Sequence, residues 1–238
     1  MPSQAQVNFE RHIAKNPYPG RGIVLGSGSD GQPRIVYWIM GRSANSRNRR
    51  FVVEGGTLTT VPADPSKVED PSLILYEAML ELPGIQLVSN GDQTRTLADA
   101  LKVGGSFDDA LGTRVHEPDA PNFTPRISGM LDFRAGAPRM LLSKLVASPF
   151  DSEQSDRTTF RPSWPSPGCG YALTTYASDG NPLPSFQGDP LLLPLPGDAD
   201  ASLKLYWNGL NADNRISVAI KELNPDGTLR SLLVKNRF

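Results

Sequence analysis

Residues 35–50 read Ile35-Val36-Tyr37-Trp38-Ile39-Met40-Gly41-Arg42-Ser43-Ala44-Asn45-Ser46-Arg47-Asn48-Arg49-Arg50, an apolar run followed by a segment dense in hydrogen-bond donors. The run over residues 35–40 is typical of a buried strand. Residues 41–50 supply four guanidinium groups, two side-chain amides and two hydroxyls. Because guanidinium forks match phosphate and carboxylate oxygens, this cluster at a strand end suggests an anion-binding site. A solvated, charged loop is the alternative that this segment alone leaves open.

Apolar runs separated by turn signals predict antiparallel strands over much of the chain. The strongest hairpin signal is Asp30-Gly31, which lies between two apolar runs. Residues 72–82 fit either a buried strand or a short helix, and the Pro83-Gly84 turn after them favours a strand. The expected strands are residues 21–27, 34–40, 51–54, 57–61, 72–82, 85–89, 126–133, 139–147, 171–177, 215–223 and 228–234.

Two helical segments are expected between these strands. Asp92 suits the N-cap of a helix over residues 93–102, in which apolar residues share one face. Ser106, with Asp109 three residues later, resembles a capping box for a second short helix. A few helices among many antiparallel strands indicate the α+β class.

We expect a single domain over residues 1–238, with three segments that the patterns leave less defined. Residues 1–17 are polar and are expected to form a short helix or a loose N-terminal arm. Residues 148–200 are rich in proline and show little hydrophobic periodicity, so we expect a loop region within the domain. Residues 203–210 fit a strand or a helix.

The charge balance excludes a general attraction to nucleic acids or anionic membranes. The chain has 24 Lys and Arg against 25 Asp and Glu, so any anion site must be local. No apolar run approaches the ~20 residues that span a bilayer, and residues 1–15 lack the apolar core of a signal peptide. One cysteine excludes an internal disulfide and fits a cytoplasmic location. Two histidines and one cysteine argue against a zinc or iron site, so no cofactor is expected.

Three further polar clusters stand at expected strand ends or in loops, where functional sites are usually built. Tyr76 lies in an apolar run, where a core tyrosine is the alternative. Residues 88–93 form a strand, a glycine turn and a helix start, whose free N–H groups suit an anion, with simple capping as the alternative. Residues 116–126 carry three prolines that stiffen a loop bearing two carboxylates, an amide and a guanidinium. An ordinary charged connection is the alternative for this loop.

Common catalytic signatures are absent from the sequence. There is no Walker loop, Rossmann glycine motif, paired-histidine metal motif or nucleophile elbow. Cys169 has no neighbouring histidine to act as its base, which argues against a cysteine nucleophile. The polar clusters, rather than one short motif, must therefore indicate the function.

Taken in order, these clusters resemble the archaeal-type IMP cyclohydrolase family. The pieces that carry the resemblance are Gly41-Arg42-Ser43 through Asn48-Arg49, Tyr76, Val88-Ser89-Asn90-Gly91 and Asn122-Phe123-Thr124-Pro125-Arg126-Ile127. Glu117 and Asp119 resemble the acidic residues of the family's equivalent loop. Pro167-Gly168-Cys169-Gly170 and Thr174-Thr175-Tyr176 resemble later family landmarks more loosely.

The resemblance implies a fold, a reaction and a substrate. The implied fold is a four-layer αββα sandwich of largely antiparallel sheets, like that of N-terminal nucleophile hydrolases but used without a catalytic N-terminal residue. The segment before Arg21 agrees, because it offers no Cys, Ser or Thr at the start of a strand. The implied reaction is the metal-independent closure of 5-formamidoimidazole-4-carboxamide ribonucleotide, a purine-precursor monophosphate, to IMP with loss of water.

That reaction needs a base for the carboxamide nitrogen, donors for the formyl oxygen and cations for the phosphate. On the resemblance, the expected catalytic residues are Arg42, Tyr76, Glu117 and Asp119. The expected substrate-binding residues are Ser43, Asn45, Arg47, Arg49, Asn90, Asn122 and Arg126. Along an extended segment Arg47 and Arg49 would point together toward the substrate, with Arg50 on the surface.

Two other functions are compatible with the same sequence. The chain could bind a purine nucleotide without catalysis, or it could be an amide hydrolase on the same fold, although no nucleophile for the latter is evident. No nucleic-acid or membrane partner is expected, and a homo-oligomer is an open alternative to a monomer.

Overall fold

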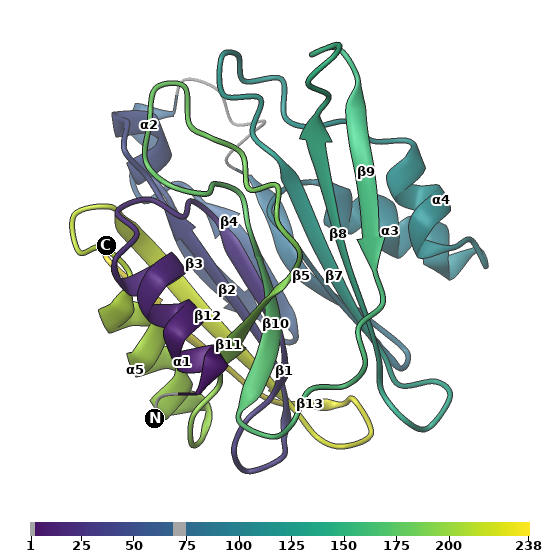
Figure 1. Cartoon of the computed structure of the whole chain (residues 1–238). Coiled ribbons are helices and arrows are strands. Elements are labelled where there is room, and N and C mark those ends of the chain that lie inside the picture. The colour runs from purple at the N-terminus through teal and green to yellow at the C-terminus, as the bar shows by residue number, and fades with distance from the viewer. Residues whose placement is uncertain (1–2, 69–74) are drawn as a thin grey trace.

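In the computed structural model, which describes residues 3–68 and 75–238, the described strands form two antiparallel sheets that pack face to face (Figure 1). The strand order in the first sheet is β11-β10-β1-β2-β12-β13, and in the second β3-β4-β5-β6-β7-β8-β9. The first sheet consists of β1 (Gly22–Ser27), β2 (Pro33–Met40), β10 (Cys169–Thr174), β11 (Leu191–Pro194), β12 (Arg215–Leu223) and β13 (Leu229–Asn236). The second consists of β3 (Arg50–Glu54), β4 (Thr57–Val61), β5 (Tyr76–Leu82), β6 (Ile85–Ser89), β7 (Arg126–Asp132), β8 (Arg139–Ala147) and β9 (Ser155–Phe160).

Strand β2 shows why its sequence is a continuous apolar run rather than an alternating one. Every residue of β2 is buried, because both faces of the first sheet are covered. Side chains alternate between the two faces along the strand. Tyr37 and Ile39 point into the core between the sheets, whereas Trp38 and Met40 pack under the helices.

Helices cover the outer face of each sheet (Figure 1). The first sheet is covered by α1 (Gln4–Phe9), which continues into the π-helical turn η1 (Glu10–Ala14), and by α5 (Ala199–Gly209). The second sheet is covered by α3 (Gln93–Lys102) and α4 (Phe107–Gly112). The layers therefore follow the order helices, sheet, sheet, helices. A short helix, α2 (Ala44–Arg47), and the 3₁₀ turn η2 (Pro65–Lys67) lie in connections between strands.

The predicted hairpins and the α+β class are confirmed. The pairs β1–β2, β3–β4, β5–β6 and β12–β13 all form in antiparallel register. The expected strand over residues 72–82 is present from Tyr76 onward, and residues 72–74 lie outside the described residues. The ambiguous residues 203–210 belong mainly to helix α5, and the N-terminal arm is helical over 4–14.

Two expectations about local structure hold only in part. Residues 148–200 are not mainly a loop region: besides β10, which overlaps the strand expected over residues 171–177, they contain the edge strands β9 and β11. The composition of β9 and β11 hid these two strands, because edge strands have one row of backbone groups free of pairing and tolerate Ser, Thr and Pro. Asp92 is the N-cap residue of α3, as predicted, but its side chain makes no capping hydrogen bond. Its carboxylate instead forms ion pairs with Arg114 and Arg126.

Candidate functional site

A cavity of about 330 Å³ opens beside the end of β2. Four segments that are far apart in sequence build its wall: the entry to β1, the stretch from Met40 to Arg49, the loop after α4, and the segment that follows β10. Its lining residues are Tyr18, Gly20, Arg21, Met40, Arg42, Ser43, Asn45, Ser46, Arg49, Glu117, Asp119, Asn122, Thr124, Tyr176 and Leu183. The cavity therefore joins the arginine-rich segment to the proline-rich acidic loop.

Helix α2 determines which arginines reach this cavity. Ser43 caps α2 through a reciprocal capping box with Ser46, so the chain turns helically over residues 44–47. The expectation of an extended segment, with Arg47 and Arg49 pointing together, is therefore wrong. Arg47 donates to Gly41 O and to Asn214 Oδ1, outside the cavity lining. Arg50 is exposed, as expected.

Arg49 and Asn45 both line the cavity. Arg49 is buried, and its Nε and Nη2 donate to Ser46 O at 2.8 Å and Met40 O at 3.0 Å, which fixes the guanidinium plane. Its Nη1 has no hydrogen bond to any residue that the structure describes. Oδ1 of Asn45 is buried and likewise lacks a partner among the described residues.

Arg21 and Glu117 form a buried ion pair at the cavity wall. Arg21 Nη2 lies 2.7 Å from Glu117 Oε2, with the side chains only 10% and 4% exposed. Arg21 Nη1 also donates to Asn90 O at 3.0 Å. Burial by itself would lower the pKa of Arg21, but the neighbouring Glu117 carboxylate outweighs it and raises that pKa well above its usual value. The Arg21 guanidinium therefore stays charged beside the carboxylate.

Asp119, Thr124 and Tyr176 form a hydrogen-bonded chain along another part of the wall. Asp119 Oδ1 accepts from Thr124 N at 2.6 Å, and Asp119 Oδ2 accepts from the Thr124 hydroxyl. The Thr124 hydroxyl also bonds to the Tyr176 hydroxyl. Burial raises the pKa of the Tyr176 phenol, so this group stays protonated.

Aromatic stacking and an ion pair shape the mouth of the cavity. The rings of Tyr18 and Tyr176 stack at 5.8 Å between centroids, and the guanidinium of Arg42 lies 5.0 Å from the Tyr18 centroid. Arg42 also pairs with Asp179 and donates to Gly180 O at 3.0 Å. Both partners of that pair are partly exposed, with side chains 35% and 43% accessible. Arg42 therefore tethers the segment after β10 across the mouth.

Of the residues expected from the sequence, seven line the cavity: Arg42, Ser43, Asn45, Arg49, Glu117, Asp119 and Asn122. The other four lie outside its lining. Tyr76 is in the core between the sheets, where its hydroxyl bonds that of Tyr37 at 2.7 Å. The amide of Asn90 bonds Pro125 O, Ile127 N and Gln93, and Arg126 bonds Val115 O, Asp92 and Gln93. Their predicted roles in binding or catalysis, and that of Arg47, stay predictions.

Eight lining residues were not selected from the sequence: Tyr18, Gly20, Arg21, Met40, Ser46, Thr124, Tyr176 and Leu183. Thr124 and Tyr176 belong to pieces that carried the family resemblance, so their position in those pieces was the available signal. Arg21 stands at the start of a predicted strand and looks like an ordinary flanking charge. Its role depends on contact with Glu117, 96 residues away, which no local pattern encodes.

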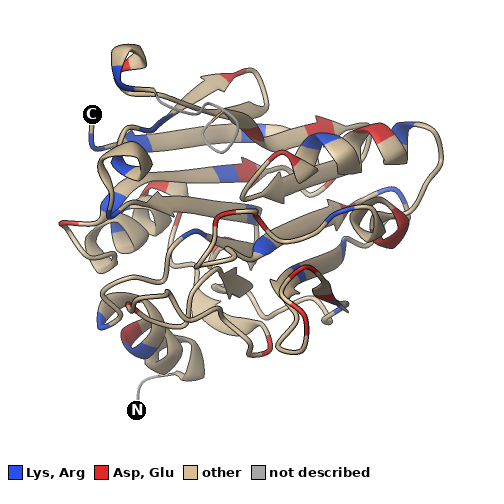
Figure 2. Cartoon of the chain, turned by 90° about the horizontal axis from the view of Figure 1, so that it is seen from above, with Lys and Arg blue, Asp and Glu red and all other residues tan. Residues whose placement is uncertain are grey.

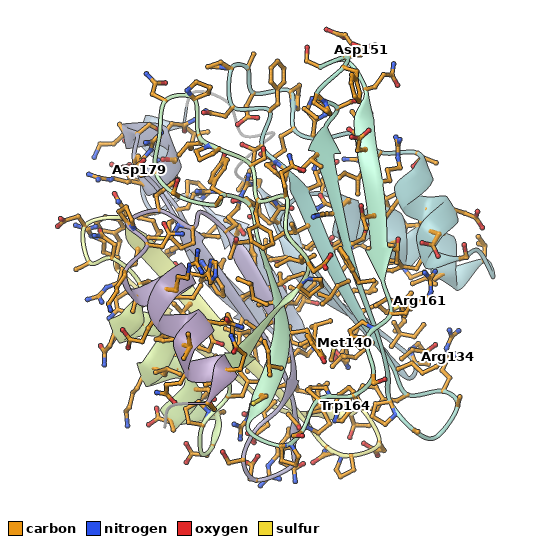
Figure 3. The ribbon with its side chains drawn as sticks, viewed as in Figure 1. Arg134, Met140, Asp151, Arg161, Trp164 and Asp179 are labelled. Atoms are coloured by element: carbon orange, nitrogen blue, oxygen red, sulfur yellow. The ribbon has the colours of Figure 1, made fainter. Side chains whose placement is uncertain are left out.

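A second cavity, of about 540 Å³, lies between α3, α4 and the second sheet. It is lined partly by Arg134, Met140, Arg161 and Trp164, which Figure 3 places well away from Asp179 at the mouth of the first cavity. Its charges are largely paired: Asp132 with Arg134 and Arg139, and Asp108 with Arg161. None of the residues expected from the sequence to form the site lines it.

Other features of the surface give no competing site. Figure 2 shows acidic and basic residues intermixed along the molecule rather than gathered on one face. In the described ranges, 3–68 and 75–238, no three His, Cys, Asp or Glu side chains come together in a way that could hold a metal ion. Within the same ranges, every helix is too short or too polar to cross a membrane.

The chain matches the family described as IMP cyclohydrolase-like protein over residues 18–227, and it belongs to that family. Among curated relatives, an IMP cyclohydrolase of Methanopyrus kandleri is 30% identical over 163 residues, which cover 67% of this chain and 75% of the relative. An IMP cyclohydrolase of Methanococcus maripaludis is 31% identical over 118 residues, covering 48% of this chain and 58% of the relative. An IMP cyclohydrolase of Methanocaldococcus jannaschii is 28% identical over 116 residues, covering 48% and 57%. The chain thus spans little more than half the length of two of these three relatives.

Proposed function

We propose that this protein is an IMP cyclohydrolase, which closes 5-formamidoimidazole-4-carboxamide ribonucleotide to IMP with loss of water. The observation that carries the proposal is the meeting of two carboxylates, Glu117 and Asp119, with the guanidinium groups of Arg21, Arg42 and Arg49 at one cavity. Membership of the IMP cyclohydrolase-like family and the names of the archaeal relatives support it.

The reaction divides into three requirements that this wall can meet. The carboxamide nitrogen must lose a proton as it attacks the formyl carbon, and a carboxylate at the wall can accept that proton. The formyl oxygen gains negative charge, which the fixed guanidinium of Arg49 can stabilise. The substrate monophosphate is a dianion, and Arg42 at the mouth offers a cation to it.

The remaining polar groups suit the neutral parts of the substrate. The side-chain amide of Asn45 can hydrogen-bond the carboxamide, and the Ser43 oxygen, whose own proton goes to Ser46 Oγ, can accept a hydrogen bond. Because both reacting groups belong to one molecule, holding them in the folded geometry would supply much of the acceleration. The side chains that line the cavity can fill each of these roles.

The order of layers also supports a fold-level proposal. We infer that the arrangement of helices, sheet, sheet and helices is the αββα sandwich of N-terminal nucleophile hydrolases. In this chain the site would then be built from side chains within the sandwich rather than from an N-terminal nucleophile. Cys169 fits that view, because burial raises the pKa of its thiol, opposite to the shift that activates a cysteine.

Two neighbouring arginines provide a matched test of the proposal. The purified protein is incubated with the formamido ribonucleotide, and IMP formation is followed by absorbance. We expect turnover above the uncatalysed rate, and we expect Arg49→Gln to lower kcat/KM by roughly 10²- to 10³-fold, as for loss of an oxyanion donor. Arg50→Gln, which removes the same charge one residue away on the exposed surface, should leave kcat/KM within about twofold.

The outcome separates the proposal from its rivals. Folded protein that gives no IMP would refute cyclohydrolase activity. If calorimetry then showed IMP binding, weakened by Arg49→Gln but not by Arg50→Gln, the site would be a nucleotide-binding site without catalysis. Equal activity of the two variants would show that the reaction takes place elsewhere in the molecule.

A further inference from the structure

The direction of the hydrogen bonds between Asp119, Thr124 and Tyr176 follows from counting protons. The Thr124 hydroxyl has one proton, and it donates that proton to Asp119 Oδ2. In its bond with Tyr176, the Thr124 oxygen must therefore accept, and the Tyr176 hydroxyl must donate. The Tyr176 oxygen is left with lone pairs, which can accept a hydrogen bond from a ligand in the cavity that this residue lines.

The ring of Tyr176 is held firmly in this orientation. One side is stacked on Tyr18, with an interplanar angle of 22°. Gly20 lies close by: a Cβ atom at this position would be 2.5 Å from Cδ2 of Tyr176. Tyr176 N also donates to Pro19 O at 3.2 Å. The phenol oxygen is thus a preorganised acceptor rather than a mobile side chain.

We propose that Asp119 is the general base of the cyclisation and that it receives the substrate proton through Tyr176 and Thr124. This inference rests on the proposed function. The carboxamide N–H bond breaks as its proton bonds to Tyr176 Oη, the Tyr176 proton moves to Thr124 Oγ1, and the Thr124 proton moves to Asp119 Oδ2. The electron pair of the N–H bond forms the new bond to the formyl carbon, and the formyl π pair moves to the formyl oxygen.

The proton count of the whole reaction is satisfied by this relay. Tyr176 and Thr124 each gain one proton and lose one, so only the substrate and Asp119 change. The formyl oxygen then leaves as water with two protons, one returned from Asp119 and one from the formamido nitrogen. The enzyme ends in the state in which it began.

Glu117 is less suited to be the base. Its Oε2 lies 2.7 Å from the permanent cation of Arg21, and protonation of the carboxylate would forfeit much of that attraction. Asp119 is instead bonded to a backbone N–H and a neutral hydroxyl. The geometry thus gives the two acidic residues different tasks: Glu117 holds Arg21, and Asp119 accepts the proton.

Variants of Thr124 test the relay without removing the carboxylate or the phenol. Thr124→Val keeps the shape of the side chain but breaks the chain of hydroxyls, whereas Thr124→Ser restores a hydroxyl. In single-turnover experiments we expect Thr124→Val to lower the rate of IMP formation by roughly 10²-fold, the scale of general-base catalysis, and Thr124→Ser to stay within about fivefold of the unmodified protein. The affinity of each variant for IMP, measured by calorimetry, should change less than about threefold.

Two further measurements distinguish a relay from a merely structural threonine. In mixtures of H₂O and D₂O, a plot of the single-turnover rate against the deuterium fraction should be curved, because several protons move together. Thr124→Ser should keep this curvature. The single-turnover rate of the double variant Thr124→Val/Tyr176→Phe should lie within about twofold of the rate of the slower single variant, because both residues act as one unit.

The relay and the proposed function are refuted by different results. If folded Thr124→Val turns over as fast as Thr124→Ser, or if the isotope dependence is linear, the relay is wrong while the cyclohydrolase function stands. If the unmodified protein forms no IMP, the proposed function fails and the relay fails with it.

Discussion

Replacement of Arg21 by methionine should destabilise the fold far more than loss of an ordinary surface charge. The partner carboxylate, Glu117, is 3% exposed, so Arg21→Met leaves a nearly buried anion without its cation. Removing one partner of such a pair typically costs about 3–5 kcal/mol. Since domains are stable by only about 5–15 kcal/mol, this is a large fraction of the total. The Arg21→Met/Glu117→Gln double variant removes the buried charge as well, and should recover at least about half of the loss.

Urea unfolding at pH 7, followed by circular dichroism, measures these free energies. Arg95→Met is the matched control, because Arg95 pairs with Glu77 in a pair whose side chains are 46% and 30% exposed. We expect that control to cost no more than about 1 kcal/mol, as for exposed pairs. A loss below about 1 kcal/mol for Arg21→Met, or a double variant as unstable as the single one, would refute the buried-pair reasoning.

Three other predictions concern the cavity wall, acid stability and the cavity mouth. Gly20→Ala should destabilise the protein and weaken IMP binding, because φ is +73° and the new Cβ would lie 2.5 Å from Cδ2 of Tyr176. The control Gly31→Ala, at φ +80° with open space around it, should show only the cost of the backbone conformation. Hydrogen bonds from its arginine partners lower the pKa of Asp132 to about 2, so their stabilisation is present above pH ~4 and lost as the pH falls toward 2. Asp132→Asn should therefore be less stable at pH 7 and lose less on acidification, measured by urea unfolding at each pH. Arg42→Gln should raise the Kd for IMP roughly tenfold while changing the free energy of unfolding by less than about 1 kcal/mol, and a change confined to stability would contradict a binding role.

The sequence predicted those parts of the fold that local patterns encode. Asp30-Gly31 between apolar runs predicted the β1–β2 hairpin, and the continuous apolar run over residues 35–40 predicted a buried strand. Helix α2 was missed, because its four residues are too few for a hydrophobic period and only the Ser43–Ser46 capping box marks it. That single turn separates Arg47 from the cavity and leaves Arg49 in its wall.

The site was predictable only as far as its residues stand in contiguous pieces. Glu117 and Asp119 share a stiff loop and Arg49 follows a strand in a dense cluster, and the resemblance of these pieces to one family led to their selection. Arg21 and Tyr176 reach the same cavity through the first sheet, where β1 and β10 are paired although about 150 residues separate them. Pairing of that range follows from the packing of the whole chain, so the sequence could not indicate it without the fold.

A crystal structure of this protein with IMP bound tests the central claim most directly. The account predicts IMP in the 330 Å³ cavity, with its purine ring within hydrogen-bond distance of Asn45 or Tyr176 and its phosphate near Arg42. IMP in the larger cavity beside Arg134 and Arg161, or bound with no contact to these groups, would contradict it.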